Sequence, residues 1–157
     1  MMKKIINPWV HKEGYNCFGC CPNNPSGLHL SFWEDGDYIL TKWCPQPDYQ
    51  GWIDTLHGGI QSLLVDEVAG WVVVRKLQTS GVTSKMEVQY LKPISTLDPQ
   101  LTIRAKIVKQ LRNIAFIEAE ILNCRDEICT KATLTYFCAS QQKAREEFQF
   151  EGCEVEE

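Results

Sequence analysis

Two kinds of hydrophobic spacing divide the chain. From Leu28 to Cys44, and again from Gly81 to Tyr136, apolar and polar residues alternate in segments with a period of two. This alternation is typical of strands with one buried face. Residues 60–77 contain no proline, and their apolar residues recur at helical spacing. The pattern predicts two strands, one long helix and then four strands.

The predicted helix is apolar around most of its circumference, so we expect it to be buried. The apolar residues that make it so are Ile60, Leu63, Leu64, Val65, Val68, Ala69, Trp71, Val72 and Val73. Cleanly alternating strands favour an antiparallel sheet with one covered face, and this helix is available to cover it. We therefore predict an α+β fold in which a six-stranded antiparallel sheet wraps around one long central helix. Its open edges favour contact with a second copy.

The flanking segments differ in composition from this central part. Residues 1–27 form an N-terminal arm that ends in a loop rich in Cys, Asn, Pro and Gly. Residues 28–140 hold the predicted sheet and helix. Residues 141–157 form a charged, acidic C-terminal tail, which we expect to be peripheral or frayed.

Composition excludes several classes of partner. The 157 residues carry a net charge of -4, which does not favour broad attraction to nucleic acid or to an anionic membrane. No apolar run reaches the roughly 18 residues of a membrane span, and the apolar stretch within residues 1–10 is too short for a secretory signal. We predict a cytoplasmic location, where the eight cysteines would be reduced.

The cysteine-rich loop raises the question of a metal. His11, Cys17, Cys20 and Cys21 could supply up to four zinc ligands. However, the chain has no second C-x-x-C, and two adjacent cysteines rarely bind the same ion. We therefore predict a packed loop with reduced thiols and no metal. The strand cysteines, Cys124, Cys129 and Cys138, are expected to pack like small apolar residues.

The start of the predicted helix is a candidate for binding and catalysis. His57 is followed by Gly58 and Gly59, and two glycines at a helix start cost stability. They make sense where another group must approach the backbone closely. Free N–H groups at a helix N-terminus could polarise a thioester carbonyl and stabilise its tetrahedral intermediate. The alternative is an ordinary junction between a loop and a helix.

Asp66 and Glu67 are carboxylates within an otherwise apolar helix. Partial desolvation would raise the pKa of such a group and make it a better base. Alternatively, the two carboxylates face solvent or pair with basic residues nearby. Gly58 and Asp66 are separated by about 12 Å along a helix, too far for one carbonyl to touch both. If both act on one substrate, they come from different subunits, which predicts a homodimer or a dimer of dimers with shared sites.

Five motifs occur together in the chain: Cys17-Phe18-Gly19-Cys20-Cys21-Pro22-Asn23-Asn24-Pro25-Ser26-Gly27-Leu28, Gln50-Gly51-Trp52, Leu56-His57-Gly58-Gly59, Asp66-Glu67 and Tyr90-Leu91-Lys92-Pro93. Together they resemble the hot-dog acyl-CoA thioesterase superfamily, in its PaaI-like branch. The resemblance implies a hot-dog thioesterase domain over residues 28–140. It also implies hydrolysis of an acyl- or aryl-CoA thioester to the free acid and CoA. No cofactor is implied, since coenzyme A is part of the substrate.

By position, the resemblance also implies roles for individual residues. The Gly58 N–H would bind the thioester oxygen, and Asp66 of the partner subunit would act as nucleophile or as general base on water. Gln50 would orient the water or the leaving group, and Thr83 would support the attacking water. His57 would position these groups. Beside them, Glu67 is a further catalytic candidate.

Other features leave alternatives open. Basic groups near the pocket mouth should bind the CoA phosphates, and the candidates are Lys92, Arg104, Lys106 and Arg112. The tryptophans at positions 33, 43, 52 and 71 could line an acyl pocket or simply pack in the core.

The same fold could instead serve an acyl-thioester hydratase or dehydratase, although the residues around Asp48 and Asp54 do not resemble the motif of those enzymes. It could also serve a non-catalytic acyl-CoA binding protein.

Overall fold

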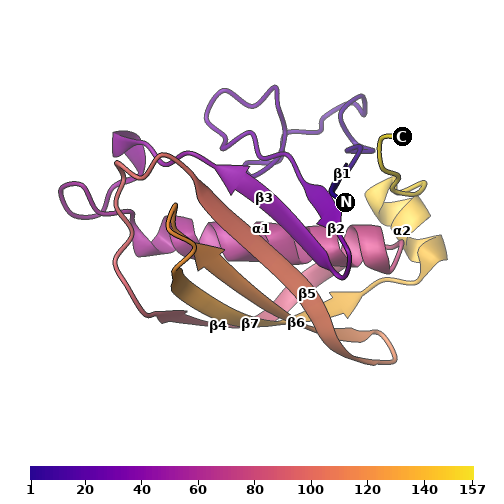
Figure 1. Ribbon diagram of the computed structural model, residues 1–157. Helices are drawn as coiled ribbons and strands as arrows, with labels where there is room; N and C mark the ends of the chain where they lie inside the picture. The colour runs from indigo at the N-terminus through magenta and orange to yellow at the C-terminus, as the bar shows by residue number, and fades with distance from the viewer.

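A computed structural model describes all 157 residues and shows one antiparallel sheet curved around a long helix (Figure 1). The central helix is α1 (Gly58–Lys76), and α2 (Gln141–Phe148) lies near the C-terminus. The strands are β1 (Lys3–Lys4), β2 (Trp33–Asp35), β3 (Tyr38–Trp43), β4 (Gly81–Tyr90), β5 (Leu101–Leu111), β6 (Ile114–Leu122) and β7 (Ile128–Cys138). They follow the order β1-β2-β3-β5-β6-β7-β4. The predicted arrangement is confirmed, with seven strands instead of six.

The core forms where the apolar stripe of α1 meets the inward faces of the strands. Leu64, Val65, Val68, Val72 and Val73 of α1 are fully buried. Each such side chain contributes about 1.5–3 kcal/mol by leaving water. The prediction of a buried central helix is therefore confirmed. Neither helix is long and apolar enough to span a bilayer.

The first predicted strand is shorter than expected. Alternation begins at Leu28, but β2 covers only Trp33–Asp35. The preceding apolar residues are buried as the alternation indicates, yet their backbone bonds go to the cysteine-rich loop. The Leu28 N–H donates to Phe18 O and the Leu30 N–H to Gly19 O. The extra strand, β1, pairs with β2 and extends the sheet beyond the six predicted strands.

The C-terminal tail is folded onto the outside of the domain, so of the two expected alternatives it is peripheral and not frayed. Helix α2 is capped by the Ser140 hydroxyl, which accepts from the Lys143 N–H. Beyond it, Phe150 and Cys153 are buried, and Val155 bridges to Ile5. The two termini consequently lie side by side (Figure 1). These few apolar residues hold an otherwise charged segment in place, and a prediction based on its charge alone overlooks them.

A charged cluster ties β2 to the end of α1 and gives a prediction for acid stability. Glu34 binds Arg75 at 3.1 Å and Lys76 at 2.8 Å. Burial raises the pKa of Glu34, but these two partners outweigh burial and leave that pKa below its ordinary value. A carboxyl whose pKa is lower in the folded state stabilises the protein above its unfolded pKa, and this stabilisation is lost as the pH falls through the folded pKa.

We therefore expect Glu34→Gln to lower the free energy of unfolding by about 1 kcal/mol at neutral pH, the scale of a partly screened charged hydrogen bond. The difference from the wild type should shrink once the pH falls below the ordinary carboxyl value. Urea unfolding across this pH range measures it, with the exposed Glu13→Gln as control. A difference that is independent of pH would contradict the prediction.

Candidate active site

The start of α1 leaves a backbone donor without an intrahelical acceptor. His57 is the N-cap, and its Nδ1 accepts from the Gly59 N–H at 2.8 Å. Gly58 is the first helical residue, so its own N–H has no acceptor within the helix. The macrodipole adds positive potential at the same point. The His57 ring thus caps the start of the helix, and the Gly58 N–H has no acceptor within it.

Tyr90, at the end of β4, holds this helix start in place. Its hydroxyl donates to Gly58 O at 3.1 Å and lies 2.7 Å from Ser62 Oγ. On the other side, Gly51 packs closely against His57. Gln50 belongs to the same loop, and its Oε1 accepts from the Asp54 N–H at 3.3 Å. Gln50 bridges to Leu56, and the His57 N–H donates to Tyr49 O, so the backbone of Gln50 runs beside the start of α1, while its side chain hydrogen-bonds to neither His57 nor Gly58.

Asp66 forms the centre of a second cluster, which lies about 12 Å further along α1 than Gly58. Thr83 Oγ1 and Tyr136 Oη both donate to Asp66 Oδ1, each at 2.7 Å. Tyr136 also donates to the Asp66 backbone carbonyl. Burial, reinforced by the nearby Asp66 carboxylate, raises the pKa of Tyr136 well above its usual value, so this phenol stays a proton donor. The two hydroxyls fix Oδ1 and leave Oδ2 free to act.

A β-bulge explains how Thr83 reaches Asp66. Thr83 pairs with Tyr136 across β4 and β7, but the next pair is Lys85 with Thr135, so Ser84 is an extra residue. The bulge breaks the predicted alternation, in which Thr83 shares a face with Lys85. Here Thr83 instead turns towards α1. Bulges often re-aim a side chain next to a functional site.

Glu67 does not join the Asp66 cluster. One position along a helix rotates a side chain by about 100°, and Glu67 points to the cysteine-rich loop, where Cys17 Sγ donates to its Oε1 at 3.4 Å. Burial, followed by the proximity of Cys17, raises the pKa of Glu67 to about 7. The structure therefore separates the two neighbouring carboxylates and assigns them to different surroundings.

The basic candidates are spread over the molecule. Lys92 follows Tyr90 closely and forms an ion pair with Glu127 at 2.7 Å. Arg104 and Lys106 lie over the Tyr38 ring and line a hollow of about 670 Å³ together with residues of β4, β6 and β7. Arg112 occupies the β5–β6 turn with a φ of 54°. Within one chain, Lys92 is thus the candidate linked to the Gly58 end of α1.

The tryptophans divide between core and surface. Trp71 stacks on Phe32, and Trp43 lies against Tyr49, so both belong to the core. Trp52 is 82% exposed on the loop beside the helix start.

Tyr136 and Tyr90 are site residues that sequence reasoning missed. Hydrophobic alternation places Tyr136 on the inward face of its strand, but no role was predicted for it. The signal was the hydroxyl itself, because a buried tyrosine usually finds a polar partner. Since Asp66 is the carboxylate of an apolar helix packed on that face, the two could have been paired.

Comparisons with known proteins agree with this arrangement. The family model described as Thioesterase superfamily matches residues 54–130. Acyl-coenzyme A thioesterase 13 of Homo sapiens is 28% identical over 86 residues, which are 54% of this chain and 61% of that protein. The match thus spans less than two thirds of that relative.

Solved structures extend the comparison. A hypothetical thioesterase protein of Streptococcus pneumoniae TIGR4, solved with coenzyme A, is 30% identical with a TM-score of 0.63, covering 67% of this chain and 83% of that one. The E. coli PaaI protein from the phenylacetic acid degradation operon is 16% identical with a TM-score of 0.64, covering 72% and 81%, and shows likeness of fold. Family and fold agree: this chain belongs to the thioesterase superfamily and has its hot-dog fold.

Proposed function

We propose that the protein is an acyl-CoA thioesterase that hydrolyses its substrate to a free acid and CoA. The observation that carries this proposal is the pair of half-sites on α1. A free Gly58 N–H lies at the helix start, and the hydrogen-bonded Asp66 carboxylate lies about 12 Å further along the helix. Neither half-site offers both a carbonyl-polarising donor and a base, whereas two copies of the chain could combine them.

The edge strand β4 suggests how two copies would meet. It is the last strand of the sheet, and a long open edge is a template for pairing. Its exposed residues include Val82 and Tyr90, at 52% and 53%, and Leu91 beyond them at 53%. Exposed apolar side chains along an unpaired edge strand favour pairing with the same strand of a second copy of the chain. We infer a homodimer, or a dimer of such dimers, that pairs along β4.

Such pairing would also complete the site. Along β4, Thr83 contacts Asp66, while Tyr90 contacts Gly58. Antiparallel pairing of two β4 strands about a two-fold axis would set the Thr83 end of one copy beside the Tyr90 end of the other. Asp66 of each copy would then approach the Gly58 amide of its partner, and the dimer would hold two sites.

The chemistry follows from these positions. The thioester oxygen would accept from the Gly58 N–H, and Asp66 Oδ2 would take a proton from water or attack the carbonyl carbon. In the general-base route, the hydroxide adds to the carbon, and the oxyanion is held at the helix start. The intermediate then collapses, the carbon–sulfur bond breaks, and the CoA thiolate takes up the proton that Asp66 removed from water, which regenerates the carboxylate. Thr83 and Tyr136 would keep the carboxylate in position throughout.

The relatives support this proposal. The pneumococcal protein was crystallised with coenzyme A, and variants of it carry alanine in place of an aspartate and of a threonine. Aspartate and threonine are the residue types that meet at Asp66 and Thr83. For the CoA phosphates we propose Lys92, because it follows Tyr90 at the Gly58 end of the site.

A screen of acyl- and aryl-CoA esters with detection of the released thiol tests the proposal. Turnover of at least one ester is expected. Hydration of an enoyl-CoA without thiol release would instead indicate a hydratase, and tight binding of CoA esters without either reaction would indicate a binding protein. Either outcome would contradict the proposed hydrolysis.

A further inference from the structure

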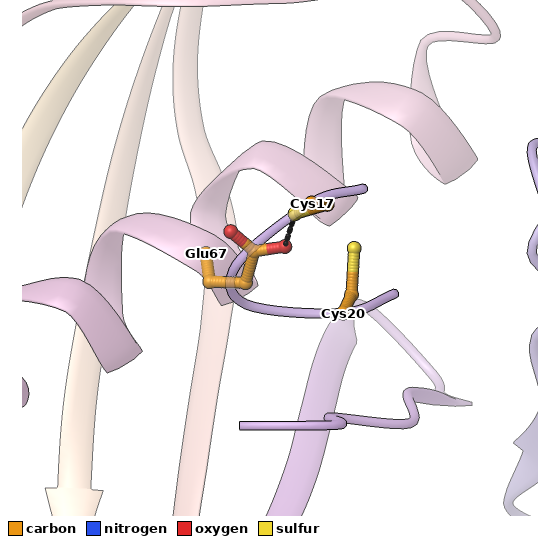
Figure 2. A group of neighbouring side chains, drawn as sticks. All are labelled: Cys17, Cys20 and Glu67. Carbon is orange, nitrogen blue, oxygen red and sulfur yellow. Dashed lines mark hydrogen bonds between the residues drawn. The ribbon is translucent and has the colours of Figure 1, made fainter. Parts of the chain in front are cut away.

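A second cluster of reactive side chains lies outside the proposed active site, between the cysteine-rich loop and α1 (Figure 2). The Sγ atoms of Cys17 and Cys20 and a carboxylate oxygen of Glu67 all lie within 4.8 Å of one another. Figure 2 shows the three side chains directed into the same space. The two cysteines come from one C-x-x-C turn, whereas Glu67 comes from the middle of the helix.

The loop is shaped around the Glu67 carboxylate. A Cβ added to Gly19, between the two cysteines, would lie 2.4 Å from Glu67 Cδ, so a larger residue there would push the carboxylate away from the cysteines. Two backbone hydrogen bonds fix this turn, because Leu28 and Leu30 donate their N–H groups to Phe18 O and Gly19 O, respectively. The cluster is therefore built into the fold.

The cluster concentrates acidic groups without a cation. None of the salt bridges in the structure involves Glu67, and no basic side chain donates a hydrogen bond to it, to Cys17 or to Cys20. Two thiols and a carboxylate that meet in a partly buried place without a cation would be stabilised by a positive ion.

The donor set identifies the ion. Two sulfur ligands and one carboxylate oxygen suit zinc, whereas calcium and magnesium require oxygen ligands throughout. With Zn–S bonds of about 2.3 Å, tetrahedral geometry puts two sulfur atoms about 3.8 Å apart, which is within the observed span of the cluster. The Tyr15 hydroxyl lies 2.9 Å from Cys20 Sγ and can donate to a zinc-bound thiolate from outside the ligand set.

We propose that Cys17, Cys20 and Glu67 bind a zinc ion that clamps the N-terminal loop to the middle of α1, with water at the fourth position. Binding releases the thiol protons to solvent. This reverses the expectation of a loop without metal, which considered His11 and Cys21 as the other ligands. His11 is exposed, and Cys21 Sγ instead faces Tyr15 O at 3.6 Å.

Metal analysis of the full-length protein, purified under reducing conditions without added zinc, tests the proposal. About one zinc per chain is expected in the wild type, and less than about a tenth of that in Cys17→Ser and Cys20→Ser. Glu67→Gln should weaken zinc retention against a chromophoric chelator. The exposed thiols provide matched controls, since Cys44→Ser and Cys124→Ser should keep the full zinc content. Cys124 lies exposed in the β6–β7 turn and is not packed within a strand as expected.

Cobalt substitution keeps the test valid even where a variant folds poorly. The wild type reconstituted with Co²⁺ should show thiolate-to-cobalt charge-transfer absorption. A wild type that contains no zinc, and that fails after reduction to take up stoichiometric zinc or cobalt, would overturn the proposal. The same conclusion would follow if folded Cys17→Ser and Cys20→Ser variants kept their zinc, or if thiol counting showed a stable Cys17–Cys20 disulfide in the reduced preparation.

Discussion

Replacing Asp66 by asparagine is expected to lower kcat by about 10²–10⁴-fold, the range for loss of a general base. Asparagine keeps the shape of the side chain and an oxygen that accepts from Thr83 and Tyr136. It can neither take a proton from water nor attack a carbonyl carbon. Steady-state kinetics with thiol detection should therefore show a loss in kcat at nearly unchanged melting temperature.

The matched control for this variant is Asp37→Asn, an equivalent change at the exposed β2–β3 turn, which lies at the opposite end of α1 from Gly58. It should retain wild-type kcat. Wild-type turnover by the Asp66→Asn variant would show that the Asp66 carboxylate takes no part in the reaction.

Replacing Gly58 by proline is expected to lower kcat by about 10²–10³-fold, as for the loss of one oxyanion donor. Proline lacks the N–H, and the first position of a helix is the place where a helix tolerates it best. The preceding residue also suits proline, because His57 is extended, with φ -60° and ψ 134°. The change therefore removes one donor while the helix start is preserved.

Gly58→Ala serves as the comparison because it keeps the N–H. Its Cβ would lie 3.5 Å from the Tyr90 ring, which is ordinary van der Waals contact. Alanine should therefore fold normally and lose less activity than proline. Equal activity of the proline variant and the wild type would exclude the Gly58 amide as the oxyanion donor.

Hydrophobic spacing was sufficient to predict the architecture. The broad apolar stripe of α1 and the alternation of β5, β6 and β7 appear directly in the fold, because burial against one core enforces both periods. Gly58 and Asp66 could also be singled out, since two glycines and a carboxylate are costly at their positions in a helix.

Other parts depend on contacts that spacing does not encode. The bulge at Ser84 turns Thr83 towards the helix, and a single extra residue leaves no signal in an alternating strand. Glu67 belongs with Cys17 and Cys20 although about 50 residues separate them in sequence, because the loop folds back over α1. The C-terminal tail docks through isolated apolar residues such as Phe150, which its charge obscures.

In the proposed dimer, each active site takes Gly58 from one chain and Asp66 from the other. A mixed dimer tests it most directly, prepared by co-expressing an Asp66→Asn chain and a Gly58→Pro chain with different tags. One of its two sites would hold both intact groups, so about half of the wild-type activity per dimer is expected, while each parent variant alone stays nearly inactive. A mixed dimer as inactive as its parents would contradict the shared site.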